Sequence, residues 1–129
     1  MLEPGRFIVA DAGIIESEVI LVSKKKLNQK NRCVYLDIGR FGGLAETEGE
    51  AIRYKIEVKG NKGDKGPVII AGPTCDGVDI LYEKNSYQFP LRLKAGDKVR
   101  IYSTGAYRSV YGSNFNGMPK LKEYFIISS

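Results

Sequence analysis

The sequence predicts a mainly β domain, a Greek-key barrel or sandwich of about seven or more short antiparallel strands with one or two short helices. Short runs of β-branched and aromatic residues recur along the chain, and fifteen glycines and five prolines separate them. Patterns with a helical period are scarce. A chain of 129 residues suits one domain with one hydrophobic core.

The first expected element is a helix over residues 7–15, where apolar side chains could line one face before Gly13 weakens the pattern. Seven strands follow, each a short run rich in β-branched, aromatic or other apolar residues. The glycine-rich connections between them have the composition of hairpin tips and tight turns. The expected strands cover residues 18–25, 32–38, 53–58, 68–71, 91–93, 98–102 and 124–127.

The composition argues against several classes of function. The chain has no histidine, the commonest metal ligand and general base, so we expect neither a metal site nor Ser-His catalysis. Its apolar runs are too short to span a bilayer, and its amino terminus lacks a secretory signal, which predicts a cytoplasmic protein. We expect Cys33 and Cys75 to be free thiols, because two cysteines do not make a disulfide scaffold.

The net charge of +5 raises the possibility of nucleic-acid binding, because clustered lysines and arginines neutralise phosphates. The main cluster, formed by Lys24, Lys25, Lys26, Lys30 and Arg32, lies between two expected strands. We interpret it as an exposed hairpin tip whose charges are solvated, so nucleic acid is not the favoured partner. The alternative function is that of a non-enzymatic small basic β-barrel that binds single-stranded nucleic acid or a protein partner.

Three loops, at residues 39–46, 72–79 and 104–117, mix glycine with aromatic and chemically competent side chains. The segment GPTCDGVD at 72–79 is similar to the cysteine-aspartate loop of the fold-type III pyridoxal-phosphate-dependent decarboxylases that act on ornithine, lysine and arginine. The segments EPGR at 3–6, GAY at 105–107 and FNG at 115–117 occur in the order that this family requires. Residues 37–44 resemble the bacterial branch, so the resemblance extends over essentially the whole chain.

The resemblance implies a division of the chain and a set of partners. Residues 1–16 would be the remnant of the last strand of a (β/α)8 barrel with its connecting helix, and residues 17–129 the carboxy-terminal β-domain. The amino-terminal barrel would carry the Schiff-base lysine, so we expect this chain alone to be inactive and not to retain the cofactor. In the family, a homodimer shares its active sites, because the cysteine-aspartate loop reaches into the partner's cofactor pocket.

The resemblance also assigns residues to the cofactor, pyridoxal 5'-phosphate. Glu3 would pair with the pyridinium nitrogen and keep it protonated. Arg6 would hold the phosphate through charge-assisted hydrogen bonds, and Gly5 would let the backbone approach the phosphate oxygens. Tyr107 would donate a hydrogen bond to the same phosphate.

Cys75 resembles the catalytic thiol that protonates the carbanion left after decarboxylation. Asp76 would pair with the distal ammonium of the substrate, and Phe115 would line the substrate entrance. Diaminopimelate decarboxylases have Cys-Glu-Ser where this chain has Cys-Asp-Gly, which favours ornithine or lysine as substrate and a role in polyamine biosynthesis. Either Glu46 or Glu50 could add a second carboxylate near the substrate amine, and the sequence does not decide between them.

Overall fold

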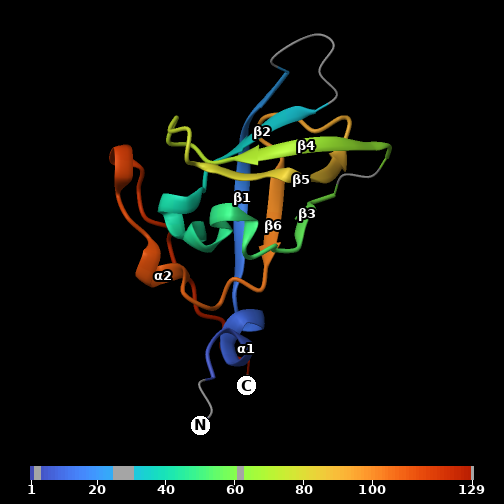
Figure 1. Cartoon of the computed structure of the whole chain (residues 1–129). Helices are drawn as coiled ribbons and strands as arrows, with labels where there is room; N and C mark the ends of the chain where they lie inside the picture. Colours follow the sequence, from blue (N-terminus) through green and yellow to red (C-terminus); the bar gives the residue numbers. More distant parts are fainter. Residues whose placement is uncertain (2–3, 25–30, 61–62, 129) are drawn as a thin grey trace.

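Six strands form one curled sheet in the computed structural model, which describes residues 1, 4–24, 31–60 and 63–128. The strands are β1 (Ile14–Ser23), β2 (Arg32–Leu36), β3 (Ile56–Val58), β4 (Lys65–Ala71), β5 (Ile80–Pro90) and β6 (Lys98–Tyr102). Their order in the sheet is β3-β6-β1-β2-β4-β5, and all neighbours are antiparallel except β2 and β4. Figure 1 shows β1 and β6 running across the direction of β4 and β5, so the sheet bends into a half-barrel.

Strand β1 joins the two halves of the sheet. Its first part, from Ile14 to Glu18, pairs with β6, and its second part pairs with β2. The change of partner falls at a register irregularity between Val19 and Leu21, a feature that bends a strand and increases its twist. Both halves therefore enclose one core.

The core is built by the alternation of side chains along the strands. In β1, Ile15 and Val19 are buried while Glu16 is exposed, and in β6 Val99 and Ile101 are buried. Burial of such a side chain contributes roughly 1.5–3 kcal/mol to the free energy of unfolding. The remaining buried members of the core are Val34, Leu36, Ile38, Leu44, Tyr54, Ile56, Val68, Ile70, Leu81, Tyr82, Phe89 and Leu93.

The helices are short and lie mostly in the connections between strands. They are α1 (Arg6–Val9), η1 (Ala10–Ala12), η2 (Arg40–Leu44), η3 (Ala45–Glu50), α2 (Arg108–Tyr111) and η4 (Phe115–Gly117). None of those in the described ranges has the length and apolar character needed to cross a bilayer. The helix expected over residues 7–15 is only partly confirmed, because Gly13 takes an extended conformation and the chain then enters β1. Phe7 and Ile8, two of the apolar residues expected to line one face of that helix, are exposed to solvent.

The predicted class, mainly sheet with a few short helices, is confirmed. The sheet differs from the expected antiparallel barrel or sandwich of about seven or more strands: within the described residues it has six strands, one parallel pair and no ladder between its edge strands β3 and β5. The strand expected at 98–102 has the bounds of β6, and four other expected strands overlap β1, β2, β3 and β4.

Two expected strands are wrong. The residues at 91–93 form a turn in which the Leu93 amide donates to the Pro90 carbonyl at 3.1 Å. The residues at 124–127 belong to neither a strand nor a helix, and all four are at least 83% exposed. A run of aromatic and β-branched residues forms a strand only where a neighbouring edge offers hydrogen bonds, and the described part of the chain offers none to this run.

Strand β5 was not predicted, because its centre is polar. Residues 83–85 read Glu-Lys-Asn, a run that interrupts the apolar pattern. The carboxylate of Glu50 compensates for this by accepting hydrogen bonds from the amides of Glu83 at 2.8 Å and Lys84 at 2.6 Å. It also accepts bonds from the backbone and the side chain of Asn85. Glu50 therefore stabilises β5, a strand that residues 80–90 do not specify by their own sequence pattern.

These hydrogen bonds make Glu50 an acid-sensitive element of the fold. Burial raises its pKa, but the bonds from Asn85 and from the three amides outweigh that effect, so the net pKa lies below the ordinary 4.5. A lowered folded-state pKa contributes stability that is complete above the unfolded pKa and is lost as pH falls through the folded one. We expect Glu50→Gln to lower the free energy of unfolding at pH 7 by an amount that shrinks below pH 4.5.

Urea unfolding of the wild type and Glu50→Gln at pH values between about 3 and 7 measures this difference. Glu48→Gln is the matched control, since Glu48 is an exposed residue of the same short helix. A difference that stays constant over the whole range would contradict the assignment.

The prediction that the cluster of basic residues is solvated is wrong for Arg32. Lys25, Lys26 and Lys30 lie outside the described residues, but Arg32 is only 6% exposed. Its guanidinium donates to the carbonyls of Phe89 at 2.9 Å and Pro90 at 3.0 Å. This arginine is therefore a buried link between β2 and the end of β5, because its buried donors find acceptors in the carbonyls of that strand end.

Candidate active site

The structure brings Gly5, Arg6 and Tyr107 together, although about a hundred residues separate the first two from the third. A Cβ atom on Gly5 would lie 2.5 Å from the Tyr107 hydroxyl, so only glycine fits at this position without a shift. The guanidinium carbon of Arg6 lies 5.6 Å from the centre of the Tyr107 ring and 6.0 Å from that of Tyr54. Both distances are in the range of cation–π attraction.

A close crossing of two backbone segments creates this arrangement. The Gly105 amide donates to the Ala10 carbonyl at 2.8 Å, and the Thr104 amide donates to the Gly13 carbonyl at 2.9 Å. A Cβ on Gly13 or on Gly105 would collide with the backbone of the other segment. Tyr107 then adopts a left-handed conformation with φ 60°, which turns the chain into α2. The Gly-Ala-Tyr motif thus places a phenol beside Arg6.

Arg6 forms an ion pair with Glu46, a residue at the start of η3. The two side chains are 26% and 27% exposed. The contact of this ion pair joins Arg6 Nη2 to Glu46 Oε2, whereas Arg6 Nη1 is shielded from solvent and has no hydrogen-bond partner among the described residues. A buried donor without an acceptor is costly, so this guanidinium suits an anion that brings further oxygens.

This group of residues fits the phosphate of the cofactor that the sequence implies. A phosphate offers acceptors for the two Arg6 nitrogens and for the Tyr107 hydroxyl, and the lack of a side chain on Gly5 leaves space beside that hydroxyl. Glu3, expected to pair with the ring nitrogen, lies outside the described residues.

The cysteine-aspartate loop connects β4 to β5. Cys75 is an exposed free thiol in a left-handed conformation with φ 58°, and Cys33 is free as well, as expected. A carboxylate oxygen of Asp76 accepts the Val78 amide at 2.9 Å, which closes a local turn. The loop therefore presents a thiol and a carboxylate side by side at the end of the sheet.

Asp79 holds this loop in place, a role that the sequence did not reveal. Its side chain is 1% exposed and accepts hydrogen bonds from the Thr74 hydroxyl at 2.7 Å and from the Arg40 amide at 2.8 Å. A Cβ on Gly39 or Gly72 would collide with its carboxylate. Asp79 thus ties the cysteine-aspartate loop to the start of η2. In the sequence, the only hint of this role is the pair of glycines, Gly39 and Gly72, that leave room for its carboxylate.

Phe115 lies next to the same loop. Its ring stacks on Phe41 with the ring centres 4.0 Å apart and the planes inclined by 21°. The neighbouring Asn116 donates from its side chain to the Thr74 carbonyl at 2.9 Å. All three glycine-rich loops that the sequence singled out therefore meet at this end of the molecule.

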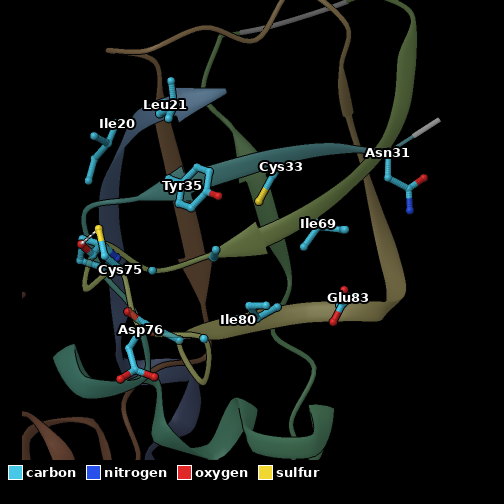
Figure 2. A pocket seen from close by; sticks show the side chains of 15 residues that line it. Ile20, Leu21, Asn31, Cys33, Tyr35, Ile69, Cys75, Asp76, Ile80 and Glu83 are labelled. Carbon is cyan, nitrogen blue, oxygen red and sulfur yellow. Dashed lines mark hydrogen bonds between the residues drawn. The ribbon is translucent and has the colours of Figure 1, made fainter. Parts of the chain in front are cut away.

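A hollow of about 570 Å³ opens beside Cys75 and Asp76 (Figure 2). Tyr35 and Cys33 also line it, and Figure 2 shows Cys75 and Tyr35 on the same side of the hollow. A hydrogen bond with the Cys33 side chain raises the pKa of the Tyr35 phenol above its ordinary value. Apolar side chains complete the wall, namely Ile20, Leu21, Ile69 and Ile80.

The predicted site residues thus form two groups. Gly5, Arg6 and Tyr107 form the phosphate group, and Cys75 and Asp76 form the thiol group, with Phe115 beside it. Among the described residues, no hydrogen bond, ion pair or aromatic contact joins a member of one group directly to a member of the other.

The structure also distinguishes the two glutamates that the sequence left open. The Glu50 carboxylate accepts hydrogen bonds from the backbone of β5, whereas Glu46 lies beside the phosphate group and contacts Arg6. Tyr54, whose ring faces the same guanidinium, was not predicted, because a single tyrosine in a strand-like run reads as a core residue.

The chain is similar in sequence to proteins of known function. The model of the family "Pyridoxal-dependent decarboxylase, C-terminal sheet domain" matches residues 7–105. A diaminopimelate decarboxylase of Staphylococcus aureus is 33% identical over 97% of this chain, and a lysine/ornithine decarboxylase of Selenomonas ruminantium is 35% identical over 89% of it. The chain spans 29% and 28% of the lengths of these two proteins.

Among solved structures, the lysine/ornithine decarboxylase of Vibrio vulnificus complexed with cadaverine superposes with a TM-score of 0.79 at 31% sequence identity. The match covers 92% of this chain and 31% of that protein. The similarity therefore extends over the whole sheet and concerns about a third of a longer polypeptide.

Proposed function

Because the chain belongs to the pyridoxal-dependent decarboxylases and forms their C-terminal sheet domain, we propose that it serves an enzyme that converts ornithine or lysine into the diamine and CO2. Its contribution is the cysteine-aspartate loop and part of the cofactor-phosphate site. The observation that carries this proposal is the phosphate group, in which the Arg6 guanidinium, with a buried Nη1 that has no hydrogen-bond partner among the described residues, lies beside Tyr107 and Gly5.

In the phosphate group, Arg6 and Tyr107 hold the phosphate of pyridoxal 5'-phosphate, and Gly5 allows the backbone to approach it. When bound, the cofactor supplies an electron sink for the electron pair left by the departing CO2. Glu3 is proposed to pair with the ring nitrogen. These residues bind and orient the cofactor, so their effect is on its affinity.

In the thiol group, Cys75 donates a proton from Sγ to the carbon that loses CO2, which directs the reaction to the diamine. Its exposed position on the loop, with φ 58°, supports this role because the thiol is not enclosed by the core. Asp76 pairs with the distal ammonium of the substrate, and Phe115 borders the entrance on the far side of the loop.

The separation of the two groups supports a shared active site. We propose a homodimer in which the thiol group of one protomer completes the phosphate group of its partner. The amino-terminal barrel, with the Schiff-base lysine, would form the rest of the pocket. In this proposal residues 1–16 are the end of the barrel and its connecting helix, and residues 17–129 are the β-domain; β1 itself begins at Ile14 and so spans the proposed boundary.

Diaminopimelate decarboxylation is the second candidate, because several curated relatives at 30–35% identity carry that name. The two substrate classes differ at the distal end, where diaminopimelate has a carboxylate in addition to the amine. A negative Asp76 next to this end favours a substrate with an amine alone.

The test is a comparison of lysine, ornithine and meso-diaminopimelate as substrates of the intact enzyme. We expect kcat/KM for lysine or ornithine to exceed that for diaminopimelate at least tenfold. We expect Asp76→Asn to reduce the preferred value about 100-fold, because one partner of a charge pair is removed. Asp64→Asn, on an exposed residue before β4, is the matched control. A preference for diaminopimelate would replace the first candidate by the second.

A further inference from the structure

Glu46 gives the phosphate group an unusual charge balance. A site for a phosphate dianion gains affinity from an arginine whose charge is unopposed, but here a carboxylate of the same chain contacts the Arg6 guanidinium. Both side chains are largely removed from solvent, at 26% and 27% exposure, so water screens the interaction incompletely. The phosphate and Glu46 therefore have to share the positive charge of Arg6.

The backbone of Glu46 is anchored, so the carboxylate cannot leave by a simple movement of the loop. The Glu46 carbonyl accepts the Ile52 amide at 3.1 Å. The next residue, Thr47, is completely buried and donates from its hydroxyl to the Leu44 carbonyl at 2.7 Å. Separation of the pair therefore requires rotation of the Glu46 or the Arg6 side chain and not a displacement of the Glu46 backbone.

We propose that Glu46 is a built-in competitor of the phosphate, which lowers the affinity of the Arg6 site for phosphate monoesters and keeps their binding reversible. When the phosphate binds, it takes a hydrogen bond from Arg6 Nη1, which Glu46 leaves unsatisfied, and competes with the carboxylate for Nη2, so that the carboxylate turns aside. This inference rests on the proposed function, in which that phosphate belongs to pyridoxal 5'-phosphate.

The competition makes a prediction about phosphate affinity that does not depend on catalysis. We expect Glu46→Gln in the intact enzyme to bind inorganic phosphate about tenfold more tightly than the wild type, because the amide keeps the shape and removes the charge. Glu48→Gln removes the same formal charge two residues away on an exposed side chain, and its affinity should stay within about twofold of the wild type. Arg6→Gln should abolish binding in every background.

Affinity is measured by titrating each variant with inorganic phosphate at constant ionic strength and following the backbone amide resonances of Gly5 and Arg6. Pyridoxal 5'-phosphate and pyridoxal are titrated in parallel. We expect Glu46→Gln to bind the phosphorylated compound more tightly and pyridoxal no differently, which separates a cofactor site from a site for free phosphate alone. Glu46→Asp, which shortens the side chain by one methylene, provides a second variant should Glu46→Gln fail to fold, and we expect its affinity to lie between the two.

If Glu46→Gln bound phosphate as tightly as the wild type or more weakly, and Arg6→Gln bound none, the proposed competition by Glu46 would be wrong. The proposed phosphate site at Arg6 would still stand. Phosphate binding that survives Arg6→Gln, or that no variant shows, would overturn both this inference and the proposed cofactor site.

Discussion

Cys75→Ala in the intact enzyme is expected to slow diamine formation by about 10²- to 10⁴-fold, the range that a positioned proton donor contributes, without releasing the cofactor. The thiol lies on the exposed loop between β4 and β5 and, among the described residues, makes no hydrogen bond with those proposed to hold the phosphate, so its loss should leave their contacts unchanged. Steady-state assays of the diamine and the absorbance of bound pyridoxal 5'-phosphate measure the two properties on the same sample.

Cys33→Ala is the matched control, because Cys33 lines the same hollow but is 9% exposed and lies within β2. We expect it to cost stability through lost packing and to leave the rate within about threefold of the wild type. A rate for Cys75→Ala close to that of Cys33→Ala would remove Cys75 from the reaction.

Arg6→Ala is expected to have the opposite profile. Loss of a guanidinium that makes charge-assisted hydrogen bonds costs about 1.5–3 kcal/mol per bond, so cofactor affinity should fall roughly 100-fold. At saturating pyridoxal 5'-phosphate most of the rate of diamine formation should return, because in the proposed role Arg6 holds the cofactor and does not touch the bond that breaks. Cofactor titration followed by fluorescence gives the affinity, and assays over the same range of concentrations give the recovered rate.

Arg100→Ala is the control for a general loss of positive charge, since Arg100 pairs on the exposed face of β6 with Glu16. Its cofactor affinity should equal that of the wild type. If Arg6→Ala and Cys75→Ala reduced affinity and rate to the same extent, the separate roles assigned to the phosphate group and the thiol group would be wrong.

Strands were predicted best from the sequence where the local pattern of apolar and polar residues agrees with the tertiary environment. Strand β6 was predicted with its correct bounds because its alternation of buried and exposed residues is regular and its turn, residues 94–97, has clear turn chemistry. Strand β5 was missed because its polar centre depends on Glu50, which lies more than thirty residues earlier. The run at 124–127 shows the reverse, since its residues favour a strand but have no partner in the described part of the chain.

The site could be predicted in part from motifs, and the remainder depended on packing. The motifs brought attention to Gly5, Arg6 and Tyr107, which the structure places together. No local pattern indicates that Glu46 contacts Arg6 or that Asp79 fixes the cysteine-aspartate loop, because both contacts join segments distant in the sequence. The role of Arg32 was misjudged for the same reason, as its acceptors are carbonyls of a strand end almost sixty residues away.

The parallel pairing of β2 with β4 has a consequence for how such a domain can diversify. Parallel neighbours cannot be joined by a tight turn, so the chain must travel back along the sheet before the second strand begins. Phe41 and Glu46 lie on that return path, and neither belongs to the ladders of β2 and β4. Tyr54 and Glu50 lie on it too, but one is part of the core and the other stabilises β5. We therefore expect sequence changes that retune the site to be tolerated at positions such as Phe41 and Glu46, and not throughout the excursion.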